Sequence, residues 1–176
     1  MKKQASMVSL VLVLFIICAV TALLLGLVNS ITEEPIKEIN QAKTDASMQE
    51  VLPADSYEKM NYTGDDGQIT AVYQAGDAGY VVLLSVSGSQ SMIDMAIGVD
   101  NDGAVTGVSI IDMSETPGLG DKASEPSFRD QFVGTTGDLS VNKDGGTIVA
   151  LTGATITSRA VTRGVNAAVA AAATMG

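Results

Sequence analysis

Histidine and tryptophan are absent from this sequence of 176 residues, and cysteine occurs once, as Cys18. Without histidine the chain can form neither a Ser-His-Asp triad nor a Cys-His pair, and it has no imidazole ligand for a metal. Cys18 has no second cysteine with which to form an intrachain disulfide or hold an iron–sulfur cluster. These absences exclude most chemistry that side chains perform unaided, so redox or transfer chemistry here requires a borrowed cofactor.

Basic residues are also scarce: 10 Lys and Arg stand against 20 Asp and Glu, for a formal net charge of -10. A surface that binds phosphate backbones needs clustered Lys and Arg, and the sequence contains no such cluster. Nucleic acid is therefore excluded as a partner. The acidic balance favours solubility and association with cationic partners.

The longest apolar run covers residues 7–28 and carries no charge. As a helix with a rise of about 1.5 Å per residue it spans about 33 Å, which matches a hydrocarbon core of roughly 30 Å. A cleaved signal peptide is the alternative, but its apolar core is usually shorter and ends at a small-residue cleavage site, which the residues after Gly26 do not clearly offer. We therefore predict an uncleaved transmembrane helix over 7–28. Because it has no ionisable residue, this single span cannot itself carry ions.

Charges on either side of this run predict its orientation. Lys2 and Lys3 precede it, whereas Glu33 and Glu34 follow it. By the positive-inside rule, residues 1–6 form a cytoplasmic N-terminus and the rest of the chain lies on the outer side of the membrane. We expect a single-pass protein of the cell (inner) membrane with an extracytoplasmic domain.

The segment after the anchor, residues 29–66, is predicted to be a juxtamembrane helix followed by a connector. Apolar residues recur at near-helical spacing over 31–51, with Thr32 as the N-cap and Pro35 in the first turn. The residues that follow are polar and rich in turn formers, which is typical of a connector. The next domain is therefore expected to occupy 67–176.

In this domain, short runs rich in β-branched residues alternate with turns, and the chain ends in an alanine-rich helix. The Asp-Asn-Asp-Gly sequence at 100–103 is typical of a hairpin turn, whereas a calcium loop would need later EF-hand ligands that are missing. Strands segregated from helices indicate an α+β domain with an antiparallel sheet and flanking helices. The expected strands are 68–74, 80–86, 92–99, 105–111 and 147–151, a loop covers 113–122, a short segment follows at 126–133, and the helix is 159–174.

Four hydroxyl groups crowd the turn where the last expected strand leads into the last helix. A helix N-terminus offers unpaired N–H groups and a partial positive charge, which together favour a phosphate. Gly153 and Ala154 have almost no side chain, so a bulky group can approach the backbone there. From the residues alone, the hydroxyls are more commonly caps for the first N–H groups of a helix, and both interpretations stay open. The hydroxyl residues are Thr152, Thr155, Thr157 and Ser158.

The sequence Thr152-Gly153-Ala154-Thr155, followed by Ile156-Thr157-Ser158, resembles the flavinylation motif of FMN-binding domains. In that family the threonine that closes the Gly-Ala-Thr triplet becomes a phosphoester of FMN, which a separate flavin transferase installs from FAD. The resemblance implies that Thr155 carries covalent FMN in this chain. It also leaves open whether Thr157 and Ser158 bind the phosphate or cap the helix, and whether Arg159 pairs with the phosphate or is solvated.

A second stretch, Glu115-Thr116-Pro117-Gly118-Leu119-Gly120, resembles the flavin-contacting loop of the same family, with Lys122 just beyond it. Ser127-Phe128 and Gln131-Phe132 resemble the family's next segment. A histidine often precedes the Glu-Thr-Pro stretch, and Met113 holds that place here, which argues against proton transfer at this position. With one membrane span ahead of both motifs, the chain resembles the G-subunit family of Rnf electron transport complexes.

The resemblance implies a non-catalytic electron-carrier subunit of an ion-translocating ferredoxin:NAD oxidoreductase, whose partners are the other Rnf subunits and a flavin transferase. Two alternatives remain: the C-subunit family of Na+-translocating NADH:quinone reductase, and an extracytoplasmic FMN-binding or sensory module without electron relay. No metal ligand is expected. The cofactor-binding residues that the resemblance implies are Thr155, Thr152, Gly153, Ala154, Thr157, Ser158, Glu115, Thr116, Pro117, Gly118, Leu119, Gly120 and Lys122.

Overall fold

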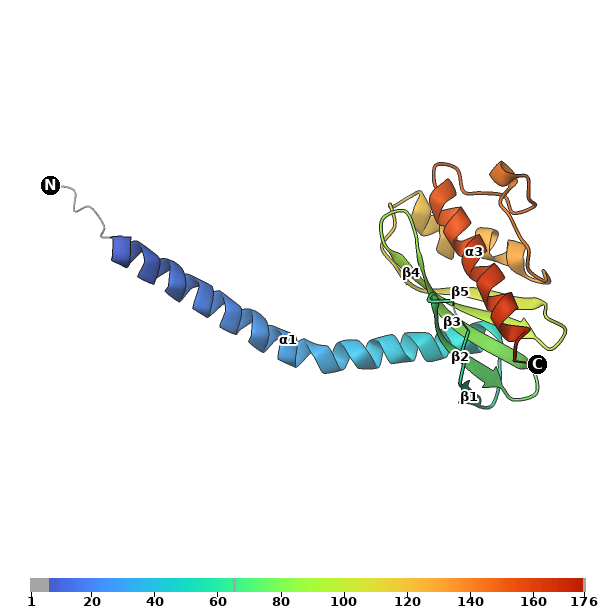
Figure 1. Cartoon of the computed structure of the whole chain (residues 1–176), viewed down its shortest axis with the longest axis horizontal. Coiled ribbons are helices and arrows are strands. Elements are labelled where there is room, and N and C mark those ends of the chain that lie inside the picture. Colours follow the sequence, from blue (N-terminus) through green and yellow to red (C-terminus); the bar gives the residue numbers. More distant parts are fainter. Residues whose placement is uncertain (1–6, 65, 176) are drawn as a thin grey trace. The chain divides into compact units, whose positions relative to one another are not determined.

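The structure is a computed structural model that describes residues 7–64 and 66–175, so the predicted cytoplasmic N-terminus, 1–6, lies outside the described residues. The chain divides into two compact units, Met1–Ala42 and Lys43–Gly176. The first is helical where it is described, and the second contains a sheet, a long helix and several short helices (Figure 1).

Helix α1 covers Met7–Val51 without interruption. It contains a stretch of mean hydropathy 3.1 that is long and apolar enough to cross a membrane. The expected break before a separate juxtamembrane helix is wrong, because Thr32 does not cap a helix start. Its hydroxyl donates back to the carbonyls of Val28 at 2.9 Å and Asn29 at 3.3 Å, within the helix. Pro35 lies in the helix interior and not in a first turn.

The sheet is an antiparallel meander of five strands in chain order, as the α+β prediction requires. The four expected strands between residues 68 and 111 are confirmed. The expected turn at 100–103 is also confirmed, with Gly103 at φ +80° and the Asp100 carboxylate accepting from the backbone of Ala104 at 2.8 Å. The expected connector contains a further edge strand, β1. The strands are β1 Tyr57–Met60, β2 Ile69–Ala75, β3 Gly79–Ser87, β4 Met92–Asp100 and β5 Val105–Met113.

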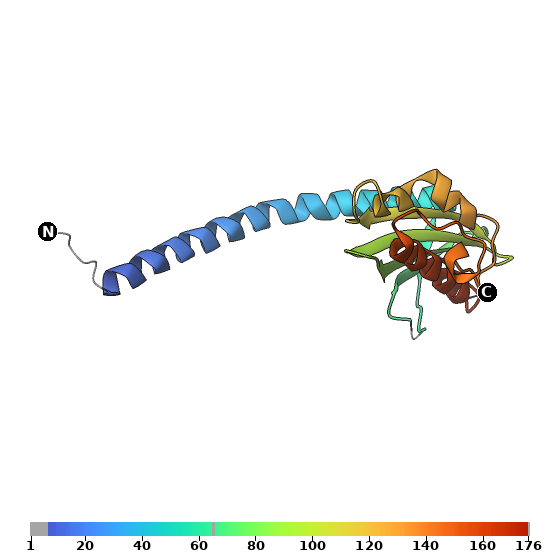
Figure 2. The ribbon, with the colours of Figure 1, turned by 90° about the horizontal axis from the view of Figure 1, so that it is seen from above.

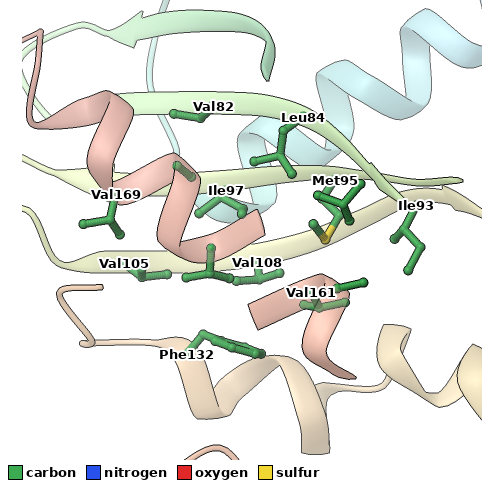
Figure 3. Packing of buried hydrophobic residues seen from close by; sticks show 14 of the residues in the cluster. Val82, Leu84, Ile93, Met95, Ile97, Val105, Val108, Phe132, Val161 and Val169 are labelled. Atoms are coloured by element: carbon green, nitrogen blue, oxygen red, sulfur yellow. The ribbon is translucent and has the colours of Figure 1, made fainter. Parts of the chain in front are cut away.

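One face of the sheet carries the main core. Helix α3, Thr155–Ala172, lies across this face (Figures 1 and 2). Its Val161 belongs to the same buried cluster as Met95 and Ile97 on β4, and Phe132 joins this cluster from the segment before α3 (Figure 3). Gly164 allows close approach, because a Cβ there would lie 2.9 Å from Leu84 Cδ1. Successive strand residues point to opposite faces, so every second residue of β3 and β4 belongs to this core.

The opposite face of the sheet packs against the last turns of α1. Met48, Val51 and Leu52 are buried there with apolar side chains of β2, β3 and β4. Gly98 and Gly107 are cross-strand partners, and a Cβ on either would come within 3 Å of the Val51 backbone. The compact unit therefore begins at Lys43, ahead of residue 67, because the end of α1 supplies part of its core.

The segment between β5 and α3 contains short helices and no strand among its described residues. The predicted strand 147–151 is wrong: only Ile148 forms a bridge, parallel to Val141. The predicted last helix begins four residues earlier than expected, at Thr155, and ends at Ala172. The short helices are η1 Gly120–Ser124, α2 Pro126–Arg129, η2 Asp130–Phe132 and η3 Asn142–Asp144.

Candidate functional site

The turn before α3 is closed by hydrogen bonds around Gly153. The Ala154 N–H donates to the Leu151 carbonyl at 3.1 Å, and Gly153 adopts φ +79°, a conformation that glycine tolerates best. Ser158, one turn into the helix, accepts from the Leu151 N–H at 3.0 Å and donates to the Ala154 carbonyl at 3.0 Å. This ties the turn to the helix and leaves Thr155 as the first helical residue, partly exposed.

None of the four hydroxyls caps the N-terminus of α3. The N-cap position is held by Ala154, without a side-chain hydrogen bond to the first turn. Thr157 and Ser158 are completely buried, and both hydroxyls are engaged inside the protein. The structure thus contradicts the expectation that Thr157 or Ser158 caps the helix. Binding of a phosphate by these two residues stays a prediction. Thr152 is exposed beside the turn.

The loop that begins at Glu115 folds into a tight turn. The Thr116 carbonyl accepts from the N–H groups of Leu119 and Gly120, both at 3.1 Å, and Gly118 adopts φ +75°. Pro117, Gly118 and Leu119 are exposed, whereas Gly120 is buried. This shape presents the tip of the loop to solvent and turns its two ends inward.

The loop and the turn, far apart in the sequence, lie against each other. A Cβ built on Gly153 would lie 3.0 Å from Leu119 Cδ2, so the Leu119 side chain covers the space that glycine leaves free. Deeper in, the Thr157 hydroxyl donates to the Glu115 carboxylate at 2.8 Å. The two stretches singled out in the sequence therefore form one site with Thr155 at its edge.

Glu115 lies at the base of this site, buried and charged. Its other oxygen, Oε1, accepts from the N–H groups of Ser89 at 2.9 Å, Gln90 at 3.1 Å and Ser91 at 3.3 Å. Burial by itself raises the pKa of Glu115, but the hydrogen bonds from Gln90, Thr157, Ser91 and Ser89 outweigh it and hold the pKa below its ordinary value. The carboxylate is therefore ionised at neutral pH.

The remaining residues of the expected site lie around its margin. Thr116 accepts from the Gln90 side-chain amide at 3.0 Å, which links the loop to the hairpin between β3 and β4. Lys122 is exposed on η1. Met113, the last residue of β5, pairs with Ile93 and packs against the main core.

Arg159 lies one helical turn beyond Thr155, and its guanidinium is engaged with a carboxylate of the same chain. It forms a two-pronged ion pair with Asp144 of η3, at 2.7 Å and 2.5 Å. The hydrogen bond and charge of Arg159 hold the pKa of Asp144 below its ordinary value. Since both side chains are solvent-accessible, this pair adds little stability, although it links η3 to α3.

Two residues that support the site were not singled out as functional from the sequence. The Gln131 side chain accepts from the Val149 N–H at 2.8 Å and donates to the Val149 carbonyl at 3.3 Å. Asn142 accepts from the Ala150 N–H at 3.2 Å. These side chains hold the segment that leads into the turn, in place of strand partners. Gln131 lies in the short segment that resembles the FMN-binding family, and this resemblance was the only feature of the sequence that pointed to a role for Gln131.

Comparisons with known proteins show the family of the chain. The family model for the FMN-binding domain matches residues 88–170, and that for the RnfG N-terminal region matches 1–51. The G subunit of an ion-translocating oxidoreductase complex from Methanosarcina acetivorans is 33% identical, and the match covers 96% of each chain. The chain belongs to the G-subunit family of ion-translocating oxidoreductase complexes. Thr155 and the loop from Glu115 both lie among the residues of this chain that match the FMN-binding domain.

Two further members of the G-subunit family have more specific names. The G subunit of the Na+-translocating ferredoxin:NAD+ oxidoreductase complex from Acetobacterium woodii is 38% identical, over 88% of this chain and 86% of its own. The G subunit of the proton-translocating ferredoxin:NAD+ oxidoreductase complex from Clostridium ljungdahlii is 36% identical, over 96% and 92%.

The fold also occurs in a solved structure. A crystal structure of the C subunit of Na+-translocating NADH-quinone reductase from Parabacteroides distasonis matches with a TM-score of 0.55 at 19% identity. The match covers 77% of this chain and 92% of the other. It confirms the expected α+β architecture.

Proposed function

We propose that this chain is the membrane-anchored electron-carrier subunit of an Rnf-type ferredoxin:NAD+ oxidoreductase complex, with one FMN esterified to the Thr155 hydroxyl. The observation that carries the proposal is the meeting of the two motifs, with Gly153 against Leu119 and Thr155 partly exposed beside them. Family membership supports FMN as the cofactor and Rnf subunits as partners.

The residues at this site suit an FMN group. An ester phosphate on Thr155 would lie at the N-terminus of a helix of 18 residues that no side chain caps, where N–H groups and the helix dipole favour a negative charge. The flat aromatic face of the isoalloxazine ring can pack on exposed apolar side chains, and Leu119 and Ile156 are 41% and 57% exposed. Gly118 has open space where a Cβ would stand, so the ring can approach the loop backbone.

Attachment would be a phosphoryl transfer. The Thr155 hydroxyl oxygen attacks the phosphorus of the FMN half of FAD, forming a P–O ester bond, while the phosphoanhydride bond to AMP breaks and AMP leaves. The hydroxyl proton passes to a base on the flavin transferase or to water. No base is needed from this chain, in agreement with its lack of histidine.

Once bound, FMN supplies electron transfer in single steps, and the chain supplies attachment, orientation and electrostatics. Covalent linkage prevents loss of the cofactor into an extracytoplasmic space without a flavin pool. The orientation follows from Lys2 and Lys3 ahead of the apolar run, which favour a cytoplasmic N-terminus and an outer FMN domain.

The attachment is tested by in-gel flavin fluorescence after full denaturation, with the full-length chain co-expressed with a flavin transferase. The wild type and Thr155→Ser retain a hydroxyl at this position, and we expect both bands to fluoresce. Thr155→Val keeps the size of the side chain but removes the nucleophile, so its band should be dark. A dark wild-type band with an active transferase, or a fluorescent Thr155→Val band, would contradict the assignment.

The electron-carrier role is tested separately, in membranes that contain the assembled complex. We expect Thr155→Val to abolish electron flow from ferredoxin to NAD+ while the complex still assembles. Unchanged flow in fully assembled membranes would instead support a binding or sensory module without electron relay.

A further inference from the structure

Three segments far apart in the sequence meet at the carboxylate of Glu115. The first is the hairpin after β3, whose three consecutive N–H groups, from Ser89 to Ser91, point at Oε1. The second is the loop from Glu115 to Gly120 itself. The third is the first turn of α3, which donates the Thr157 hydroxyl to Oε2 at 2.8 Å. One side chain therefore joins the loop, the hairpin and the helix that begins with Thr155.

Two glycines lie directly against this carboxylate, one in the hairpin after β3 and one at the end of the loop. A Cβ on Gly88 would collide with Glu115 Oε1. A Cβ on Gly120 would lie 2.8 Å from Glu115 Oε2 and 3.0 Å from Thr157 Oγ1. With the side chain enclosed in this way, Glu115 is only 7% exposed. The carboxylate is thus directed into the protein. Glu115 can therefore affect a flavin at the surface only through the residues to which it is hydrogen-bonded.

Burial of a carboxylate is unfavourable unless hydrogen bonds replace its hydration. Here four hydrogen bonds do so, and three of them come from backbone N–H groups, which form a concave anion site. The fourth, from Thr157, reaches a residue only two positions beyond Thr155. The Ser158 hydroxyl fixes the same turn from its inner side, through Leu151 and Ala154. The first turn of α3 is therefore held at two points.

We propose that Glu115 is a positioning residue for flavin attachment: through Thr157 its carboxylate holds the first turn of α3 so that the Thr155 hydroxyl faces the incoming phosphoryl group. This inference rests on the proposed attachment of FMN to Thr155. It departs from the expectation that Glu115, as part of the flavin-contacting loop, binds the cofactor itself, since Glu115 acts from beneath the site.

The test compares two buried threonines of the same helix. Thr157→Val removes the hydroxyl that reaches Glu115, whereas Thr162→Val removes a buried hydroxyl that donates only to the Ser158 carbonyl at 2.8 Å. The full-length chains, purified without flavin, are incubated with flavin transferase and FAD. The initial rate of FMN attachment and the midpoint of thermal unfolding are measured for each.

We expect attachment to be roughly tenfold slower in Thr157→Val, which loses a hydrogen bond to a charged group, and close to the wild-type rate in Thr162→Val. Thr157→Ser should restore the rate. Equal rates for the two valine variants at similar unfolding midpoints would overturn the inference, because the Glu115 contact would then serve stability alone.

Glu115→Gln provides a second variant if Thr157→Val fails to fold. Its side-chain oxygen can still accept from the hairpin N–H groups. Its amide nitrogen cannot accept the Thr157 hydroxyl proton and can only donate to that hydroxyl, so the hydrogen bond to a charged carboxylate is replaced by a weaker neutral one. Slow attachment in a chain that unfolds near the wild-type midpoint supports the positioning role, and a wild-type rate overturns it. Failure of the proposed function is distinguishable, since then the wild type itself would acquire no flavin, and both proposals would be wrong.

Discussion

Replacing Gly107 with alanine should weaken the attachment of the end of α1 to the sheet. Gly107 pairs with Gly98 across β4 and β5, and together they leave the space in which the Val51 backbone lies. A Cβ on Gly107 would lie 2.9 Å from Val51 Cα and 3.2 Å from its carbonyl oxygen. Both contacts are to backbone, so no side-chain rotation relieves them, and the helix end must move.

The expected loss of stability follows from three contributions. Overpacking of this kind costs about 1–3 kcal/mol. Displacement of α1 would also weaken the hydrogen bond from the Thr106 hydroxyl to the Val51 carbonyl, 2.6 Å long, which is worth about 1 kcal/mol. Alanine in a strand recovers roughly 0.5–1 kcal/mol relative to glycine. The net free energy of unfolding should therefore fall by about 2 kcal/mol.

Thermal unfolding of the segment Lys43–Gly176, which forms a compact unit, measures this effect. A loss of about 2 kcal/mol should lower the melting temperature by roughly 6–10 °C. Gly67→Ala is the matched control, because Gly67 is exposed and a Cβ there would meet nothing within 4 Å. A Gly107→Ala variant with the same melting temperature as the control would refute the close packing of Val51 on the paired glycines.

Three other outcomes are expected. The folded-state pKa values of Glu50 and Glu115 lie below their ordinary value of 4.5, so the stability that these groups contribute is complete above that pH and is lost as the pH falls through the folded pKa. Urea titrations between pH 7 and pH 3 should show this fall in stability, and a flat profile would contradict it. A segment that starts at residue 67 should bind hydrophobic dye and melt without cooperativity, unlike one that starts at Lys43, because it lacks β1 and the apolar side chains of α1. Gly153→Ala should reduce both stability, by about 1 kcal/mol, and the yield of covalent flavin, because φ +79° and Leu119 at 3.0 Å oppose a side chain there; undiminished yield and stability would contradict this account of the turn.

The sheet was predictable because its signals are local. The strands around 92–99 and 105–111 consist of β-branched and apolar runs, and the Asp-Asn-Asp-Gly turn between them has one favoured geometry. The meeting of the two motifs was predictable only through the resemblance to FMN-binding domains. Nothing in their spacing alone indicates that Gly153 lies against Leu119.

The errors arose where long-range contacts replace local ones. Residues 147–151 have the composition of a strand, but their N–H groups bond to side chains of Gln131 and Asn142 and not to a neighbouring strand. Thr32 and Pro35 after the anchor suggested a new helix start, whereas the helix simply continues through them, and Lys37 pairs with Glu33 one turn earlier at 2.6 Å. Apolar spacing over 31–51 was correctly assigned to helix.

The role of Glu115 could not be found from the sequence for a related reason. A glutamate before Thr-Pro in a glycine-rich loop is ordinarily a solvated surface charge. Its burial depends on N–H groups that lie 24 to 26 positions earlier in the chain. Only the folded hairpin orients those three groups toward one point.

The most direct test of covalent FMN at Thr155 is mass spectrometry of tryptic peptides from the chain co-expressed with a flavin transferase. Cleavage after Lys143 and Arg159 gives a peptide that contains every hydroxyl of the motif. We predict that this peptide gains the mass of one FMN less one water, and that fragmentation places the added mass on Thr155. An unmodified peptide in the presence of an active transferase, or the added mass on another hydroxyl, would contradict the account.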